Sequence, residues 1–129
     1  MALIVQKFGG TSVATTERIK NVAKRIARWK ARGNDIIVVP SAMSGETNRL
    51  IALAKEISPK PDPRELDVIA ATGEQVTIGL LAMALQEEGL KAKSYTGPQV
   101  RVLTDSVFTK ARILKIDDEK IRKDLDEGY

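Results

Sequence analysis

The sequence of 129 residues contains no cysteine and no histidine. Without cysteine there can be no disulfide, no thiolate metal site and no cysteine nucleophile. Without histidine, the chain also lacks the commonest general base and metal ligand. Any chemistry must therefore use lysine, serine, threonine, carboxylates and backbone N–H groups. This set suits anion binding and phosphoryl transfer, in which catalysis is mostly positioning and charge neutralisation.

Aromatic residues and long apolar runs are also scarce. The net charge is +4, but aromatic residues make up only 4% of the chain, which leaves few rings for stacking on bases. Many of the cations lie at helical spacing between residues 18 and 32, which is typical of a solvated helix face. The longest apolar run, residues 78–85, is far shorter than the roughly 20 residues of a membrane helix. The N-terminus does not follow the secretory pattern, so we expect a cytosolic protein without nucleic-acid or membrane partners.

The order strand, small-residue loop, helix occurs twice in the sequence. An apolar run at residues 3–5 leads to Gly9 and Gly10, and Thr15 or Thr16 can cap the helix that follows. The β-branched run 36–39 leads to residues 41–45 and then to a second helix, for which Ser44 is a possible cap. This order predicts an α/β fold, with a mainly parallel sheet and helices on both faces in three αβα layers. Residues 1–129 are expected to form part of one domain.

The second half of the chain predicts further helices and short strands. Asp62 and Pro63 start a helix, and residues 72–75 resemble a capping box that would break it in two before Gly89. We expect a strand at 91–95 and extended pieces near residues 100–103 and 112–116. Asp117 or Asp118 should begin a final polar helix.

Lys7 stands at the end of the first predicted strand, directly before Gly9 and Gly10. Ligands of open α/β sheets bind at the carboxyl ends of strands, and glycines let a phosphate approach the backbone closely. Lys7 could therefore neutralise a phosphoryl group, with the Ser12 hydroxyl as a further donor. The lysine precedes the glycines, so this is not the P-loop pattern, and a simple tight turn remains the alternative interpretation.

A second group of candidates follows the second predicted strand. Ser41 and Ser44 lie in its small-residue loop, and Thr47 lies in the first turn of the next helix, where it could also be merely solvated. Glu74 lies between two apolar stretches, where a carboxylate near a buried helix start would need a partner. That partner could be a ligand ammonium or a structural salt bridge.

Four stretches together resemble the aspartokinase branch of the amino-acid kinase family. They are residues 5–14 (VQKFGGTSVA), 41–45 (SAMSG) with Thr47, 72–75 (TGEQ), and 104–106 (TDS) leading to 111–113 (ARI). Singly these stretches are only suggestive, but in this order and spacing they are specific. The resemblance covers essentially the whole chain and implies the amino-acid kinase fold.

The aspartokinase branch uses Mg-ATP to phosphorylate the side-chain carboxylate of L-aspartate, on the route to lysine, threonine and methionine. The resemblance implies that Lys7 stabilises the transferring phosphoryl group and that Gly9, Gly10 and Ser12 form the phosphate loop. ATP and Mg²⁺ are the implied cofactors, although no residue here is assigned as a metal ligand. The intact enzyme is expected to be a homo-oligomer.

The same resemblance implies that Ser41 and Thr47 contact aspartate and that Glu74 holds its α-ammonium. The sequence departs from the family in lacking the later glycine-rich stretch, which supplies an arginine and an aspartate, and in lacking the adenine-binding loops and the regulatory ACT domains. Residues 1–129 are therefore expected to be the N-terminal part of a catalytic domain, inactive alone. The alternatives are another kinase of the same fold, for glutamate or uridylate, and a non-catalytic binding or assembly module.

Overall fold

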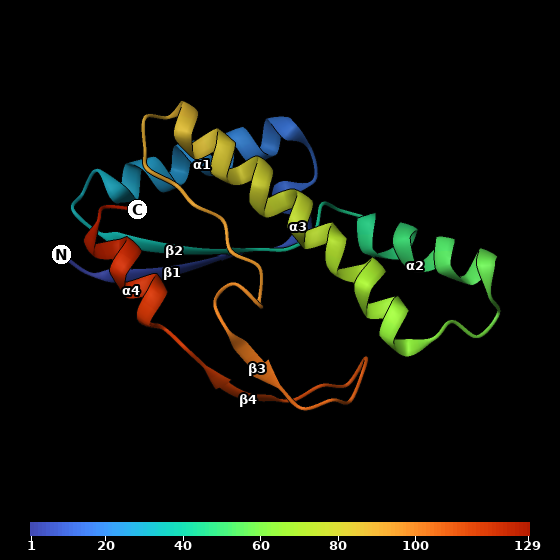
Figure 1. The fold of residues 1–129 in the computed structure, drawn as a ribbon. Helices are drawn as coiled ribbons and strands as arrows, with labels where there is room; N and C mark the ends of the chain where they lie inside the picture. The colour runs from blue at the N-terminus through green and yellow to red at the C-terminus, as the bar shows by residue number, and fades with distance from the viewer.

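The computed structural model describes all 129 residues and contains two small sheets and four α-helices (Figure 1). Strands β1 and β2 pair in parallel, and β3 and β4 form an antiparallel hairpin. The elements in chain order are β1 (Leu3–Phe8), η1 (Gly10–Val13), α1 (Thr16–Lys30), β2 (Asp35–Pro40), α2 (Glu46–Ile57), α3 (Pro63–Glu87), β3 (Val102–Thr104), β4 (Ile113–Ile116) and α4 (Glu119–Asp126).

The first unit is the predicted parallel arrangement of β1, α1 and β2. The Thr15 side chain caps α1 by accepting a hydrogen bond from the N–H of Arg18 at 3.2 Å. Gly33, with φ at +85°, then reverses the chain into β2 in a conformation that favours glycine. The parallel register runs from Leu3 beside Asp35 to Phe8 beside Pro40, and confirms the predicted α/β class.

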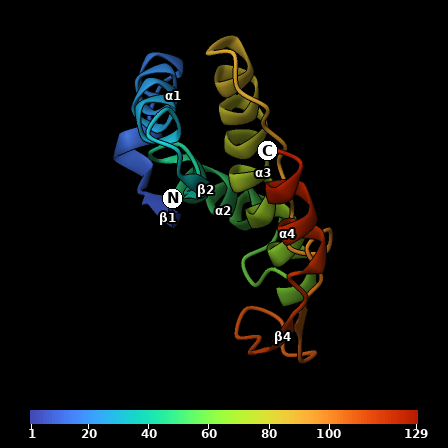
Figure 2. The same ribbon diagram turned by 90° about the vertical axis from the view of Figure 1, so that its left-hand side faces the viewer.

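The core lies between α1, α3 and one face of the β1–β2 pair. Helices α1 and α3 stand side by side above these strands (Figure 2), and Phe8, Ile36 and Val38 pack against the cluster from the sheet. On the opposite face, Leu3 and Val5 are exposed. The buried apolar members are Val13, Ile19, Val22, Ala23, Ile26, Leu81 and Leu85.

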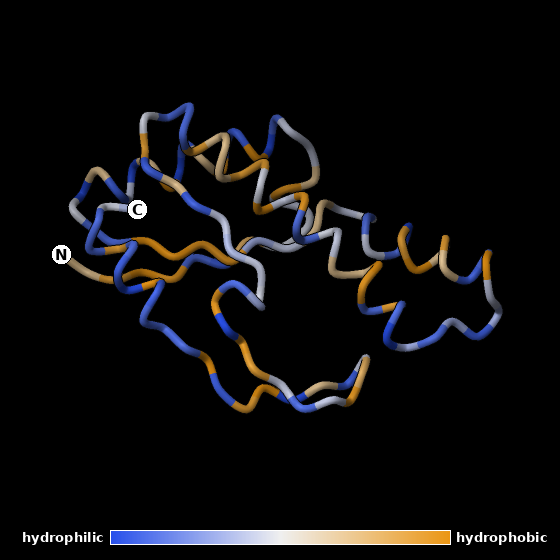
Figure 3. The backbone as a smooth tube through the Cα atoms, in the orientation of Figure 1, coloured by the Kyte–Doolittle hydropathy of each residue, from blue (hydrophilic) through white to orange (hydrophobic).

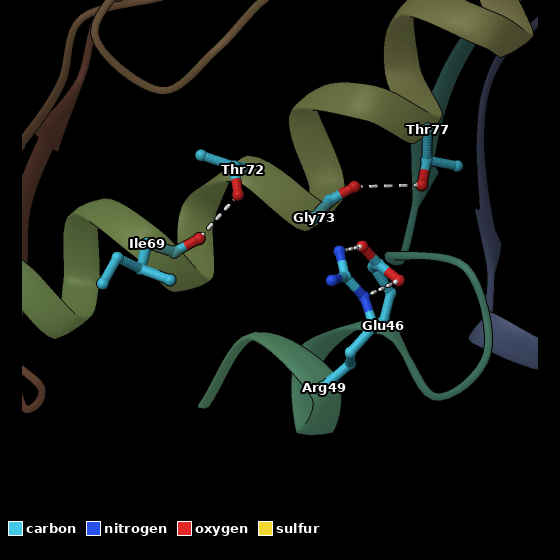
Figure 4. A network of polar contacts seen from close by, with 6 residues as sticks. All are labelled: Glu46, Arg49, Ile69, Thr72, Gly73 and Thr77. Carbon is cyan, nitrogen blue, oxygen red and sulfur yellow. Dashed lines mark hydrogen bonds and ion pairs between the residues drawn. The ribbon is translucent and has the colours of Figure 1, made fainter. Parts of the chain in front are cut away.

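Helix α3 is one continuous helix, so the predicted break at residues 72–75 is wrong. The Thr72 hydroxyl donates to the carbonyl of Ile69 at 2.6 Å instead of accepting from a following N–H, and Thr77 likewise donates to Gly73 at 3.3 Å (Figure 4). Both Gly73 and Thr77 are buried. Burial of this helix face therefore outweighs the local capping signal. The ends agree with prediction: Asp62 caps the helix and Gly89 follows it with φ at +82°.

Two smaller predictions also differ from the structure. Helix α2 has Gly45 at its cap position with no side-chain hydrogen bond, so Ser44 does not cap it. Residues 91–95 do not form a strand, because β1–β2 and β3–β4 are the only strand pairs and this segment has no β partner. Its lysines instead bind the C-terminal helix: Lys93 pairs with Asp124 at 2.9 Å. The predicted extended pieces and the final helix after Asp118 are present as β3, β4 and α4.

Helix α3 is long and apolar enough to cross a membrane by length and composition alone. The search for uninterrupted apolar runs did not detect α3 as a possible membrane span, because Glu74 and other polar residues interrupt its apolar sequence. Core helices often share the property, so it is weak support for a membrane span. In this structure α3 packs against both α1 and α2.

Candidate functional site

A cavity of about 400 Å³ lies where β1 and β2 end. Because the strands are parallel, the segments that follow them meet at one edge of the sheet. The N–H of Ser41 donates to the carbonyl of Phe8 at 2.9 Å and so joins the two strand ends. The lining comes from η1, the loop after β2, the first turn of α2 and the middle of α3. Its residues are Gly10, Thr11, Ser41, Ala42, Met43, Ser44, Gly45, Thr47, Asn48 and Glu74.

Four of the seven predicted site residues line this cavity. They are Gly10, Ser41, Thr47 and Glu74, which are spread over 65 positions of the sequence and belong to four different segments. Folding therefore brings the phosphate-loop candidate Gly10 to the three candidates for substrate binding. The other three predicted residues do not line the cavity: Lys7 lies in β1, Gly9 directly precedes η1, and Ser12 lies in η1.

Lys7, Gly9 and Ser12 are all exposed at this end of the molecule. Lys7 lies beside Val39 in the parallel register, on the sheet face that points away from the core. Gly9 has ordinary extended dihedrals, and a Cβ atom placed on it would meet no heavy atom within 4 Å. The packing of this chain therefore does not require glycine at position 9.

Gly10 differs from its neighbour because another segment approaches it closely. A Cβ atom on Gly10 would lie 3.1 Å from the carbonyl oxygen of Ala42 and 3.6 Å from the Cα of Ser44. Glycine at this position lets η1 contact the loop after β2 directly. The side chain of Arg18 also holds η1, since it donates from Nη1 to the carbonyl of Thr11 at 2.9 Å.

Glu74 is the only charged residue that lines the cavity. The expectation of a costly carboxylate near a buried helix start is wrong, because α3 is continuous there and the Glu74 side chain is exposed. The buried face of the helix passes instead through Gly73 and Thr77. Glu74 forms no ion pair within the chain, so the predicted alternative of a structural salt bridge is not present. Its carboxylate is free to pair with a ligand cation.

A second carboxylate close by, Glu46, is already paired. Arg49 binds it through two hydrogen bonds, from Nε at 3.1 Å and from Nη2 at 2.6 Å (Figure 4). These hydrogen bonds lower the pKa of Glu46 and raise the pKa of Arg49 relative to their ordinary values. The pair is electrically neutral, so Glu74 supplies the net charge at the cavity.

Three polar lining residues, Thr11, Ser44 and Asn48, were not among the seven predicted site residues. For Ser44 the sequence left two roles open, as a helix cap or as a lining residue, and Ser44 lines the cavity. Thr11 and Asn48 were not considered individually. Thr11 follows Gly10 directly, and Asn48 follows Thr47 in the first turn of α2. Thr11 and Asn48 therefore each lie next to a predicted site residue. Adjacency to a predicted site residue at a strand end or helix start was the available signal.

The residues of this chain do not form a magnesium site. No cluster of three or more histidine, cysteine, aspartate or glutamate residues is present, and the cavity contains a single carboxylate. Magnesium prefers a nearly octahedral set of oxygens and usually takes many of them from phosphates and water. These residues alone therefore do not supply the oxygen ligands that the ion needs.

A second cavity, of about 340 Å³, lies between α3 and the β3–β4 hairpin. Its lining includes Arg64, Asp67, Thr104 and Asp105. It contains none of the predicted site residues and lies away from the ends of β1 and β2. The cavity at the strand ends is therefore the better candidate for the site.

Comparison with known proteins identifies the family. The family model of the amino acid kinase family matches residues 2–129. The chain belongs to the amino acid kinase family. It is 66% identical to an aspartate kinase of Pseudomonas putida and 65% identical to an aspartokinase of Pseudomonas aeruginosa, in each case over 99% of this chain and 31% of the relative. The chain thus spans about a third of the length of these curated relatives.

A solved structure supports the same relationship. The crystal structure of aspartate kinase from Synechocystis matches with a TM-score of 0.80 and 47% sequence identity, over 98% of this chain and 20% of that chain. The resemblance to aspartokinases and the predicted fold class are therefore confirmed. The individual roles of the seven site residues remain predictions.

Proposed function

We propose that this chain forms the aspartate-facing part of an aspartate kinase, which transfers the γ-phosphoryl group of Mg-ATP to the side-chain carboxylate of L-aspartate. The observation that supports this most strongly is the cavity at the strand ends, where Gly10, Ser41, Thr47 and Glu74 meet. The high identity to aspartate kinases is consistent with the same reaction. The product would be 4-phospho-L-aspartate, as a step toward lysine, threonine and methionine.

The cavity offers chemistry that fits an amino acid. The unpaired carboxylate of Glu74 can bind the α-ammonium of aspartate, and the hydroxyls of Ser41 and Thr47 can hydrogen-bond its polar groups. Because Glu74 is the only charge in the lining, a zwitterionic substrate would be oriented with its ammonium toward α3. The β-carboxylate would then point toward the glycine loop after β1.

The transfer forms a bond between a carboxylate oxygen and the γ-phosphorus and breaks the bond from that phosphorus to the β,γ-bridging oxygen, so ADP leaves with the electron pair. Lys7 is proposed to neutralise the transferring group, and Gly9, Gly10 and Ser12 to contact the phosphates. Gly9 is suited to this contact because it is open to its surroundings and has no packing neighbour. Mg²⁺ would neutralise phosphate charge, with ligands mostly from ATP.

Removing the negative charge of Glu74 tests the proposal. In the longest form of the protein that its gene encodes, Glu74→Gln should raise the KM for aspartate roughly 10- to 100-fold, as expected for the loss of one charge-assisted contact. Glu65→Gln, on the exposed face of the same helix, is the matched control and should behave as wild type. ADP release and hydroxylamine trapping of the acyl phosphate measure the reaction. Phosphorylation of glutamate or uridylate instead of aspartate would contradict the proposal.

The activity of residues 1–129 alone is a separate prediction. The chain spans about a third of the length of the aspartate kinases that it resembles. The resemblance implies that an arginine and an aspartate of the site lie in the remaining part, and such groups act as a unit. The chain alone is therefore expected to give no ATP-dependent hydroxamate from aspartate. Detectable hydroxamate from these residues alone would show that they contain a complete site.

A further inference from the structure

Gly73 lies in the middle of α3, immediately before Glu74, where the helix packs closely against the loop after β2. A Cβ atom on Gly73 would lie 3.0 Å from the Cβ of Ala42 and 3.5 Å from Cδ1 of Leu50. The first of these distances is shorter than an ordinary contact between two carbon atoms. Gly79 is a second glycine inside the same helix, and a Cβ atom there would meet nothing within 4 Å.

Ala42 has little room to move away from Gly73. It is only 5% exposed, and its carbonyl oxygen packs against Gly10, where an added Cβ would lie 3.1 Å away. The preceding residue, Ser41, is tied to β1 by the hydrogen bond from its N–H to the carbonyl of Phe8. The loop is thus held between two glycines, Gly10 on one side and Gly73 on the other.

The residues on the cavity side of this contact are those that the proposed reaction uses. Glu74 follows Gly73 directly, and Ser41 precedes Ala42. The contact between Gly73 and Ala42 therefore sets the distance between the backbone positions from which the Glu74 and Ser41 side chains extend. The side chain of Glu46, in the first turn of α2 beside Thr47, also comes within 3.8 Å of the Gly73 Cβ position (Figure 4). The same point on α3 therefore contacts both segments that supply the hydroxyls.

We propose that Gly73 is a positioning residue, whose missing side chain sets the separation between Glu74 and the hydroxyls of Ser41 and Thr47. This inference rests on the proposed aspartate kinase function. Gly73 touches no substrate and acts through its contact with Ala42. Because the loop is held against Gly10, a methyl group at position 73 would push α3 away from the loop by a few tenths of an ångström. This shift widens the amino-acid end of the cavity and leaves the glycine turn after β1 in place.

Three variants in the longest form of the protein test this inference. Gly73→Ala should raise the KM for aspartate roughly tenfold, because small misplacements of binding groups have large kinetic effects. Its KM for ATP should stay as in wild type. Gly79→Ala gains the same helix propensity without a steric contact, so it should match wild type in both constants. The double variant Gly73→Ala with Ala42→Gly moves the methyl from one side of the contact to the other and should restore the KM for aspartate.

The double variant separates positioning from general damage to the fold. An unchanged KM for aspartate in Gly73→Ala would overturn the inference, and so would equal increases in Gly73→Ala and Gly79→Ala. A lack of restoration in the double variant would also overturn it, because the contact would then not be the cause.

A measurement without substrate keeps this inference distinct from the proposed function. Amide hydrogen exchange at Ser41 should be faster in Gly73→Ala than in wild type or Gly79→Ala, and should return to the wild-type rate in the double variant. If wild type fails to phosphorylate aspartate but these exchange rates hold, the proposed function fails while the contact stands. If wild type phosphorylates aspartate but the exchange rates do not differ, the positioning role fails alone.

Discussion

The two ends of the chain are held in different ways. Every buried apolar residue lies between Val13 and Leu85, whereas after Leu90 the only buried residue is the carboxylate Asp124. Figure 3 shows the same contrast, with apolar β1 and β2 and a largely hydrophilic α4. The four residues of β4 are all exposed. The comparison teaches that the first region, residues 1–90, folds around an apolar core, while the second region, residues 91–129, is held together mainly by polar contacts between its own residues.

The C-terminal helix shows what these polar contacts are. Lys93 pairs with Asp124 at 2.9 Å, and Lys91 donates from Nζ to the carbonyl of Glu127 at 2.8 Å. Both ammonium groups also lie over the ring of Tyr129, at 4.1 Å for Lys93 and 5.0 Å for Lys91. The hydrogen bond to Asp124 is the main reason that the pKa of Lys93 is raised. The C-terminal helix is therefore held by charged groups and exposed hydrogen-bond donors. The first region is stabilised instead by the burial of apolar side chains away from water.

The largest expected effect comes from a matched pair of isoleucines, one in each region. Ile26→Ala, in the core at 3% exposure, should destabilise the protein by about 2–5 kcal/mol, through lost burial and the cavity left behind. Ile113→Ala, in β4 at 61% exposure, should cost below about 1 kcal/mol. Urea unfolding of both variants measures the difference. Equal losses would show that the second region is as tightly packed as the first.

A second pair tests close packing inside the first region. Gly10→Ala should destabilise by about 1–3 kcal/mol, because the new methyl meets the carbonyl of Ala42. Gly9→Ala should stay within about 0.5 kcal/mol of wild type, because its surroundings are open and its dihedrals suit alanine. Thermal unfolding distinguishes the two adjacent substitutions. A loss of stability in Gly9→Ala equal to that in Gly10→Ala would contradict the assignment of the contact to position 10.

The predictable parts of the fold were those with strong local signals. The β-branched run 36–39, the cap at Thr15 and the Asp62-Pro63 start each determine local structure by themselves. The predictions were wrong where contacts between residues far apart in the sequence determine the secondary structure. A capping box at residues 72–75 was overridden because Gly73 packs against Ala42 and Leu50, and residues 91–95 found no strand to pair with.

Part of the lining of the candidate site could be predicted from the sequence, but the geometry of the site could not. Four of the predicted residues meet because parallel strand ends share one sheet edge, which is a rule of topology. The exposure of Glu74 could not be predicted, since it depends on which face of a continuous α3 turns toward the core. The close contact between Gly73 and Ala42 could not be predicted either, because the sequence around Gly73 does not indicate which distant residue packs against it.

A smaller effect is expected at the contact that attaches the β3–β4 hairpin to α3. The N–H of Thr109, whose φ of +66° is unusual for threonine, donates to Oδ2 of Asp67 at 2.8 Å. Asp67→Ala should weaken attachment of the hairpin tip by roughly 1–2 kcal/mol and speed trypsin cleavage after Lys110 and Arg112. Asp67→Asn keeps an acceptor and should restore much of the protection.

The control for this prediction is a carboxylate on the same helix that does not touch the hairpin. Glu65→Ala removes a side chain whose partner is Arg64, so cleavage at the hairpin should stay at the wild-type rate. The core should also be unaffected by Asp67→Ala, because the hairpin contributes none of its members. Loss of global stability in Asp67→Ala would show that the two regions unfold together.

The smallest effect concerns a polar contact inside the first region, the pair of Glu46 and Arg49. The Arg49 hydrogen bonds hold the pKa of Glu46 below its ordinary value in the folded protein. The stabilisation is therefore fully present above the ordinary glutamate pKa and is lost as the pH falls through the lower, folded-state pKa.

In Arg49→Gln, the NMR titration of the Glu46 carboxyl should shift upward toward the ordinary value. Asp118, whose pKa Arg122 lowers in the same way, should keep its own titration. Since Arg49 is exposed and Glu46 is only half-buried, the free energy of unfolding at neutral pH should change little. A large change would mean that polar contacts stabilise the first region as they do the second.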